Sequence, residues 1–136
     1  GHSAGDLLIT SFSNLLKKTC RQIDFISRFG GDEFVIVMVD TSVEEALRVN
    51  QRLKENLEKE QYFIPALEKF MGDMPLDIPE NRHLGFSMGI CTNFDDEDYD
   101  DLNKVLIKAD QALYYSKEHC KGEPSVWSEV RNLISQ

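Results

Sequence analysis

Two adjacent carboxylates, Asp32 and Glu33, follow a pair of glycines and precede an apolar run. Neighbouring carboxylates can hold Mg²⁺, a hard cation that prefers oxygen ligands and commonly bridges protein carboxylates to substrate phosphates. Glycines lack side chains, so Gly30 and Gly31 let a large anionic ligand approach the backbone. The combination indicates a place for a nucleoside triphosphate and its metal. The alternative is that both acids are ordinary turn residues at the start of a strand.

The apolar pattern on either side of these residues predicts a β-hairpin. Apolar residues recur at about two-residue intervals before the glycines, and an unbroken apolar run rich in β-branched residues follows them. Adjacent glycines supply the positive φ angles that tight hairpin turns need. We expect strands at about 23–29 and 34–39, and the unbroken second run predicts a strand that is covered on both faces.

Other elements must carry this hairpin. Apolar periodicity predicts, in chain order, a helix at 4–19, a helix at 42–59, a short helix at 64–71, a strand at 83–91, a helix at 101–119, a short strand at 125–127 and a helical turn at 130–134. Residues 60–82 are otherwise irregular, and a loop of this length suggests a specific role that the sequence does not assign. Residues 95–101 carry six acids, which favours a solvated loop that feeds a helix N-terminus. A calcium loop is the alternative, but the spacing does not match an EF-hand.

Length and charge narrow the function. The 136 residues are 41% hydrophobic and 29% charged, as expected for one soluble globular domain. A net charge of −9 argues against a nucleic-acid polymer as a partner, because its phosphates would be repelled. A single nucleotide carried in with Mg²⁺ is not excluded, because the metal offsets its charge. No stretch approaches a transmembrane span or a secretory signal, so no direct membrane contact is expected.

The cysteines and histidines do not form a metal-site pattern. An odd number of cysteines without ligand spacing predicts reduced thiols in a cytoplasmic setting. The histidines are scattered, and we expect surface or loop positions. The residues are Cys20, Cys91, Cys120, His2, His83 and His119.

Four stretches of the chain resemble motifs of the GGDEF family, the diguanylate cyclases. Residues 30–34 spell the GGDEF signature, residues 1–6 resemble the GHxxGD stretch, residues 86–90 the SxG strand, and residues 109–117 the ADxALYxAK helix. The resemblance implies an α/β (α+β) fold related to ferredoxin-like and polymerase-palm domains, with a mostly antiparallel central sheet flanked by helices.

The family also carries a metal-ligand Asp on a first strand and a guanine-reading Asn, both upstream of the GH pair. Because the given chain begins at Gly1, we expect a single GGDEF domain over residues 1–136 that lacks its first strand and the start of its first helix. Either residues of the protein are omitted here, or the fragment as written is inactive. The sequence leaves both possibilities open.

The resemblance implies that two GTP molecules are condensed into cyclic di-GMP with release of two pyrophosphates. This reaction needs Mg²⁺ or Mn²⁺ and a homodimer, since each domain presents one GTP. Control would come from a sensory region N-terminal to the chain, which could tether an otherwise cytoplasmic domain.

By the same resemblance, Asp32 would be a metal ligand and the proton acceptor for the 3′-hydroxyl, and Glu33 the adjacent catalytic metal ligand. Gly30 and Gly31 would leave room for the triphosphate. The remaining substrate contacts would be Asp6 with guanine, and Lys117 and Lys121 with the phosphates. Read alone, Asp6 is equally an ordinary helix-start acid, and both lysines are solvated cations at a helix end. The chain departs from the family between Lys117 and Lys121, so the role of Lys121 is the less supported one.

A second constellation precedes the hairpin. Arg21 and Asp24 precede Gly30 with five residues between Asp24 and Gly30, which matches the spacing of the family's RxxD product-inhibition site. Arg21 would donate two parallel hydrogen bonds to a phosphate or to a guanine edge, and Asp24 would accept hydrogen bonds from guanine. Arg52 of a neighbouring subunit would add a further arginine. The alternatives are a helix-ending Arg beside a strand-starting Asp, and a non-catalytic cyclic di-GMP receptor that binds through Arg21 and Asp24.

Overall fold

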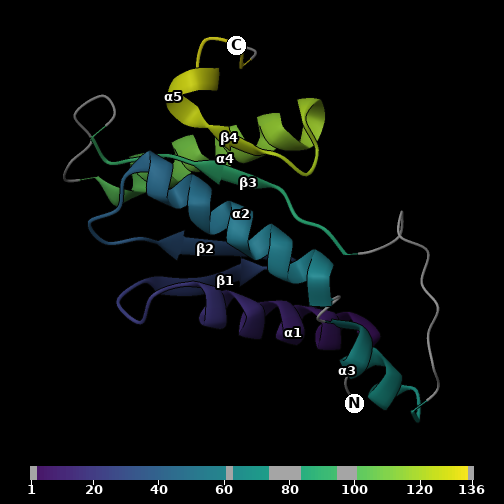
Figure 1. Cartoon of the computed structure of the whole chain (residues 1–136). Helices are drawn as coiled ribbons and strands as arrows, with labels where there is room; N and C mark the ends of the chain where they lie inside the picture. The colour runs from purple at the N-terminus through teal and green to yellow at the C-terminus, as the bar shows by residue number, and fades with distance from the viewer. Residues whose placement is uncertain (1–2, 61–62, 74–83, 95–100, 135–136) are drawn as a thin grey trace. The chain divides into compact units, whose positions relative to one another are not determined.

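The computed structural model describes residues 3–60, 63–73, 84–94 and 101–134, and the chain divides into two compact units. The first unit contains residues 1–40 and 51–84, and the second contains residues 41–50 and 85–136. Helix α2 (Val43–Glu60) contributes its first turns to the second unit and its remainder to the first. Figure 1 labels the elements.

In the first unit, helix α1 (Ala4–Thr19) leads into the hairpin of β1 (Phe25–Gly30) and β2 (Glu33–Val37). Ser3 is the N-cap of α1, and Leu15 and Leu16 on its inner face are buried. Helix α3 (Phe63–Phe70) packs against α1 (Figure 1). The predicted helices at 4–19, 42–59 and 64–71 are confirmed to within a residue.

The hairpin is antiparallel, and its strand ends differ from the prediction by one to two residues. The register pairs Phe25 with Val37 and Gly30 with Glu33, and it shifts between Arg28 and Gly30, so that Phe29 forms a bulge. The expectation that the second strand is covered on both faces is wrong. The middle of β2 is only half-buried and Val37 is exposed. Among the described residues, β2 also pairs with β1 alone, so one of its edges has no partner strand there.

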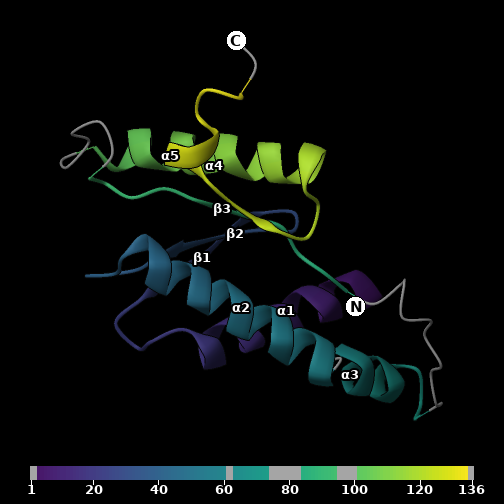
Figure 2. The same cartoon turned by 45° about the horizontal axis from the view of Figure 1, so that its top comes forward.

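In the second unit, β3 (Met88–Ile90) pairs in parallel with β4 (Pro124–Val126), and helix α4 (Leu102–His119) packs on both strands (Figure 2). Gly89 allows this approach. A Cβ at Gly89 would lie 2.2 Å from the Ala109 carbonyl oxygen and 2.3 Å from the Leu113 nitrogen. The bare glycine therefore lets strand and helix meet backbone to backbone.

The core of the second unit forms where α4 meets α5 (Trp127–Val130). Ala112, Trp127 and Val130 are buried together, with Cys91, Tyr115 and Ile134 packed around them. Trp127 donates from Nε1 to Gln111 Oε1 at 3.2 Å. This cluster accounts for the last helical segment, which begins at Trp127 rather than at Val130.

The α/β class is confirmed, although the described strands form two small sheets, one antiparallel and one parallel. The strand predicted at 83–91 is shorter than expected. Its ladder begins only where Met88 meets Pro124, and proline has no N–H to extend the ladder. The predicted acidic loop at 95–100 and much of the 60–82 loop lie outside the described residues. Asp101 does cap α4, since its side chain accepts from the Lys104 N–H at 3.1 Å. Among the described residues, no helix is long and apolar enough to cross a membrane.

Candidate active site

The turn between β1 and β2 presents the two carboxylates. Gly30 has φ +130° and Gly31 has φ +54°, which are conformations that side-chain-bearing residues rarely adopt. Gly31 and Asp32 form the two-residue loop, and Glu33 is the first residue of β2. Both acids are exposed. The predicted glycine turn is therefore confirmed, with Asp32 in the loop and Glu33 directly after it.

The turn leaves open space around its glycines. A Cβ at Gly30 or Gly31 would meet no atom within 4 Å. The glycines are thus required by backbone conformation rather than by crowding. The open space is compatible with the expectation that a bulky phosphate group approaches here.

Arg28 contacts the same turn, and the sequence analysis missed it. Its Nε and Nη2 both donate to the Gly31 carbonyl oxygen, at 3.0 Å and 2.7 Å. The sequence does contain a signal for this contact. Arg28 stands three residues before Gly31, and an arginine side chain is long enough to reach a carbonyl at that distance along the chain.

The described residues fit a divalent metal only in part. Asp32 and Glu33 supply two hard oxygen donors, but no cluster of three potential ligands occurs in the described ranges. Mg²⁺ usually takes one or two carboxylates and completes its shell with substrate phosphates and water. The pair therefore suits a metal that arrives with a nucleotide.

Asp6 has a structural role at the start of α1. Its N–H donates to Ser3 Oγ at 3.1 Å, and its Oδ2 accepts from the Ser3 N–H at 3.4 Å, which completes a capping box. The helix-start reading is thus realised, while the guanine-binding role stays a prediction. Asp6 is exposed, so its other carboxylate oxygen is not enclosed by the fold.

Arg21 and Asp24 bind each other. Arg21 Nη2 lies 3.0 Å from Asp24 Oδ1, the Arg21 backbone N–H donates to Asp24 Oδ2 at 2.9 Å, and the Arg21 guanidinium also donates to the Val39 carbonyl oxygen. The Asp24 side chain is only 2% exposed, whereas that of Arg21 is 45% exposed. The pair therefore turns a guanidinium, rather than a carboxylate, toward solvent.

These contacts shift the titration of the neighbouring groups. Burial by itself would raise the pKa of Asp24, but hydrogen bonds from Arg21 and a backbone hydrogen bond with Val39 outweigh it and lower that pKa. Burial raises the pKa of the Cys20 thiol, and Asp24 raises it further, against the opposing effect of Arg52 and Arg21. Arg52 thus lies within electrostatic range of the thiol beside the Arg21–Asp24 pair.

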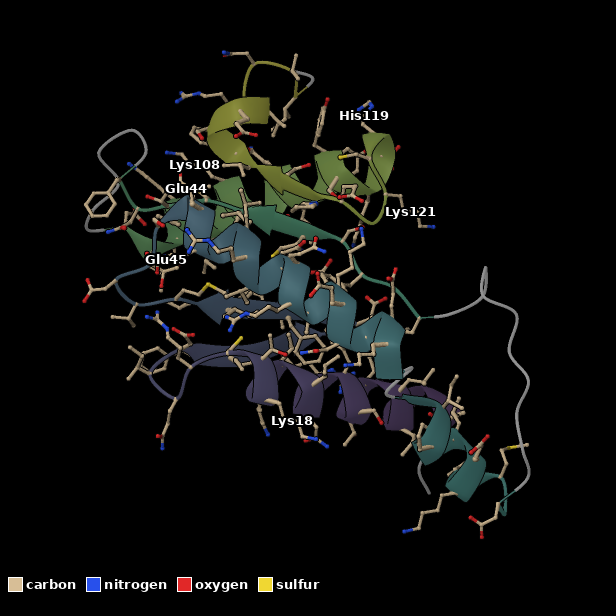
Figure 3. The ribbon with its side chains drawn as sticks, viewed as in Figure 1. Lys18, Glu44, Glu45, Lys108, His119 and Lys121 are labelled. Atoms are coloured by element: carbon tan, nitrogen blue, oxygen red, sulfur yellow. The ribbon has the colours of Figure 1, made fainter. Side chains whose placement is uncertain are left out.

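The predicted phosphate-binding lysines belong to the second unit. Lys117 lies in the last turn of α4, and Lys121 follows the C-cap Cys120. Figure 3 shows Lys121 projecting away from the loop that joins α4 to β4. This loop is held by a hydrogen bond from the Gly122 N–H to Ser87 Oγ at 3.4 Å and by one from Ser116 Oγ to the Glu123 carbonyl. The three cysteines are free thiols, and His119 is exposed at the end of α4.

Comparison with known proteins places these features in a family. Residues 1–123 match the family described as "Diguanylate cyclase, GGDEF domain". Diguanylate cyclase DosC of Escherichia coli K12 is 30% identical over 127 residues, which are 93% of this chain and 24% of DosC. Diguanylate cyclase DgcP of Pseudomonas aeruginosa is 36% identical over 117 residues, 86% of this chain and 15% of DgcP. The chain thus spans a quarter or less of the length of these two relatives.

A solved structure supports the same fold. A truncated TpbB (YfiN) from Pseudomonas aeruginosa PAO1 that comprises only the GGDEF domain superposes with a TM-score of 0.64 and 24% identity. The superposition covers 99% of this chain and 72% of that one. The family match runs through both compact units and includes the hairpin with its two carboxylates. The chain therefore belongs to the GGDEF family of diguanylate cyclase domains.

Proposed function

We propose that this protein condenses two GTP molecules into cyclic di-GMP and two pyrophosphates. The observation that carries the proposal is the open glycine turn, which presents Asp32 in the loop and Glu33 at the start of β2, both exposed, in a chain of this family. Residues 1–136 would act as one GGDEF domain.

The chemistry requires a nucleophile, an electrophile and a base. The 3′-hydroxyl oxygen of one GTP attacks the α-phosphorus of the other, a P–O bond forms, and the bond to pyrophosphate breaks. The hydroxyl proton passes to the Asp32 carboxylate, and the step repeats to close the ring. Asp32 and Glu33 would hold Mg²⁺ or Mn²⁺, which supplies positive charge beside the phosphates.

Other residues of the chain would bind the substrate. Asp6 would accept from the guanine edge, since a carboxylate offers two acceptor oxygens. Gly30 and Gly31 would admit the triphosphate to the backbone. Lys117 would pair with the phosphates, and Lys121, which projects into solvent, would assist it.

The reaction needs a homodimer, because each domain presents one GTP. We infer a cytoplasmic domain under the control of a sensory region, with no nucleic-acid polymer as a partner and no direct membrane contact. The net charge of −9 supports the exclusion of polymers.

Arg21, Asp24 and Arg52 would form a product-inhibition site. The half-exposed Arg21 guanidinium supports a first contact with the product, because a planar fork suits phosphate and guanine edges. The Asp24 carboxylate is already occupied by Arg21, so guanine would reach it only after Arg21 moves. Product binding and the Arg21–Asp24 contact would therefore compete.

The decisive test supplies the full-length protein with GTP and Mg²⁺ and detects cyclic di-GMP by mass spectrometry. Asp32→Asn should abolish synthesis and spare binding of cyclic di-GMP, because it removes the base but leaves Arg21 in place. Asp73→Asn serves as the matched control, since Asp73 is an exposed acid in the turn after α3. Synthesis that survives Asp32→Asn would show that the active site is elsewhere.

A second variant separates a cyclase from a receptor. Arg21→Ala should leave synthesis intact and abolish inhibition by added product, with the melting temperature measured in parallel because Arg21 also holds Asp24. A parent protein that binds cyclic di-GMP through Arg21 but makes none would be a receptor instead.

A further inference from the structure

We propose that Arg28 is a positioning residue of the proposed reaction. Its guanidinium holds the Gly31 carbonyl, and thereby fixes the peptide group that leads into Asp32. The inference rests on the proposed function for its catalytic consequence, while its structural part stands on the geometry of the turn.

The two glycines give the turn little rigidity of its own. Gly30 and Gly31 both adopt left-handed φ values, and glycine loses more conformational freedom on ordering than other residues. The space around both glycines is open, so packing does not fix them. Phe29 is bulged out of the ladder, and the residue is 64% exposed. The turn therefore depends on polar contacts for its conformation.

Arg28 supplies such a contact, and its own backbone is held in place. Its backbone pairs with Phe34 in the ladder, so the root of the side chain is anchored in the hairpin. From there, Nε and Nη2 converge on one acceptor, the Gly31 carbonyl oxygen, at 3.0 Å and 2.7 Å. Two donors of a planar group on one oxygen constrain its direction as well as its distance.

The Gly31 carbonyl belongs to the same planar peptide unit as the Asp32 nitrogen. An anchored carbonyl therefore fixes the plane of the peptide group that precedes Asp32. It thereby restricts the directions in which the Asp32 side chain can point. A base that must meet a hydroxyl within hydrogen-bond reach depends on this alignment. Displacements of about 1 Å can cost on the order of 100-fold in rate.

Lysine cannot replace this arrangement. An ammonium group keeps the positive charge but lacks the planar arrangement of donors. A lysine would therefore donate at most one hydrogen bond to the carbonyl, and that bond would not fix the orientation of the carbonyl. The comparison of Arg28→Lys with Arg28→Ala therefore separates orientation from charge. Ser27→Ala is the matched control, because Ser27 is an exposed neighbour on the same strand.

The first measurement is the mobility of the turn in the labelled protein. In ¹⁵N relaxation experiments, Arg28→Ala and Arg28→Lys should lower the order parameters of the Gly31 and Asp32 amides from a rigid value of about 0.85 toward 0.6. Ser27→Ala should leave them unchanged. Dispersed spectra from all variants would show that the hairpin is still folded. Order parameters that stay at the parent value in Arg28→Ala would overturn the proposal.

The second measurement is steady-state synthesis of cyclic di-GMP by the full-length protein. Arg28→Ala should lower kcat by roughly 10- to 100-fold with KM for GTP changed less than about threefold, because the base is misaligned while the proposed substrate contacts of Asp6 and Lys117, outside the turn, remain. Arg28→Lys should restore less than half of the loss. If Arg28→Lys were as active as the parent, the paired guanidinium donors would not be what positions Asp32, and the proposal would be refuted. A parent without activity would refute the proposed function instead, and the relaxation data would still decide whether Arg28 orders the turn.

Discussion

Arg21 and Asp24 join the loop between α1 and β1 to the chain that follows β2. Arg21 follows the C-cap of α1, Asp24 precedes β1, and the guanidinium also reaches the carbonyl of Val39 beyond β2. Because the carboxylate is almost fully buried, it depends on Arg21 for its hydrogen bonds. Single residues of the proposed inhibitory site therefore also stabilise the fold.

This pair predicts a pH-dependent stability. The native pKa of Asp24 is lowered, so its stabilising effect is present above its unfolded pKa of about 3.9 and is lost as the pH falls through the native value. Asp24→Asn should lower the free energy of unfolding by about 1–3 kcal/mol at pH 7. In urea titrations, the difference between parent and variant should shrink below about pH 4.

Asp73→Asn controls for the removal of one acid, because Asp73 is exposed. It should shift stability by no more than about 0.5 kcal/mol at either pH. A difference between parent and Asp24→Asn that is equal at pH 3 and pH 7 would contradict the assigned ion pair.

At the scale of elements, the close approach of β3 to α4 depends on one glycine. Gly89→Ala would place a methyl group 2.2 Å from the Ala109 carbonyl oxygen and 2.3 Å from the Leu113 nitrogen. Both are backbone atoms, which cannot rotate away as a side chain could. We expect a loss of about 3 kcal/mol or more, at the upper end of overpacking effects. Thermal or urea unfolding measures this loss.

Gly85 is the matched control for this substitution. It lies in the same segment before β3, and a Cβ there would meet no atom within 4 Å. Gly85→Ala should be neutral or stabilise by up to about 1 kcal/mol, because it restricts the unfolded chain. Equal destabilisation by both variants would show that β3 and α4 do not meet at Gly89.

At the scale of the whole molecule, the proposed reaction predicts a dependence on protein concentration. If each domain presents one GTP, specific activity should fall on dilution below the dissociation constant of the dimer, and a twofold dilution there should cost up to about half of the specific activity. Activity assays across a dilution series, with mass measured by light scattering, test this. Specific activity that stays constant while the protein is monomeric would contradict the dimer requirement.

Much of the architecture could be predicted from local patterns. The helices at 4–19, 42–59 and 101–119 follow from apolar spacing at helical period, and the structure places them within a residue of those bounds. The hairpin follows from two glycines between apolar runs. These features depend on contacts between neighbours in the chain, which composition and spacing encode directly.

The amino-acid order also sufficed to indicate the family, because the motifs are local strings, and the family match confirms it. Only the tertiary structure decided three other points. Asp24 is buried under Arg21, Arg28 grips the turn of the carboxylates, and Gly89 lets a strand touch a helix. The reason is physical. The Arg21–Asp24 and Arg28–Gly31 contacts each join residues only three apart, but the direction of these side chains and the burial of Asp24 follow from the folded backbone. Gly89 meets Ala109 and Leu113 of α4, which lie far along the chain, so spacing in the sequence does not specify that approach.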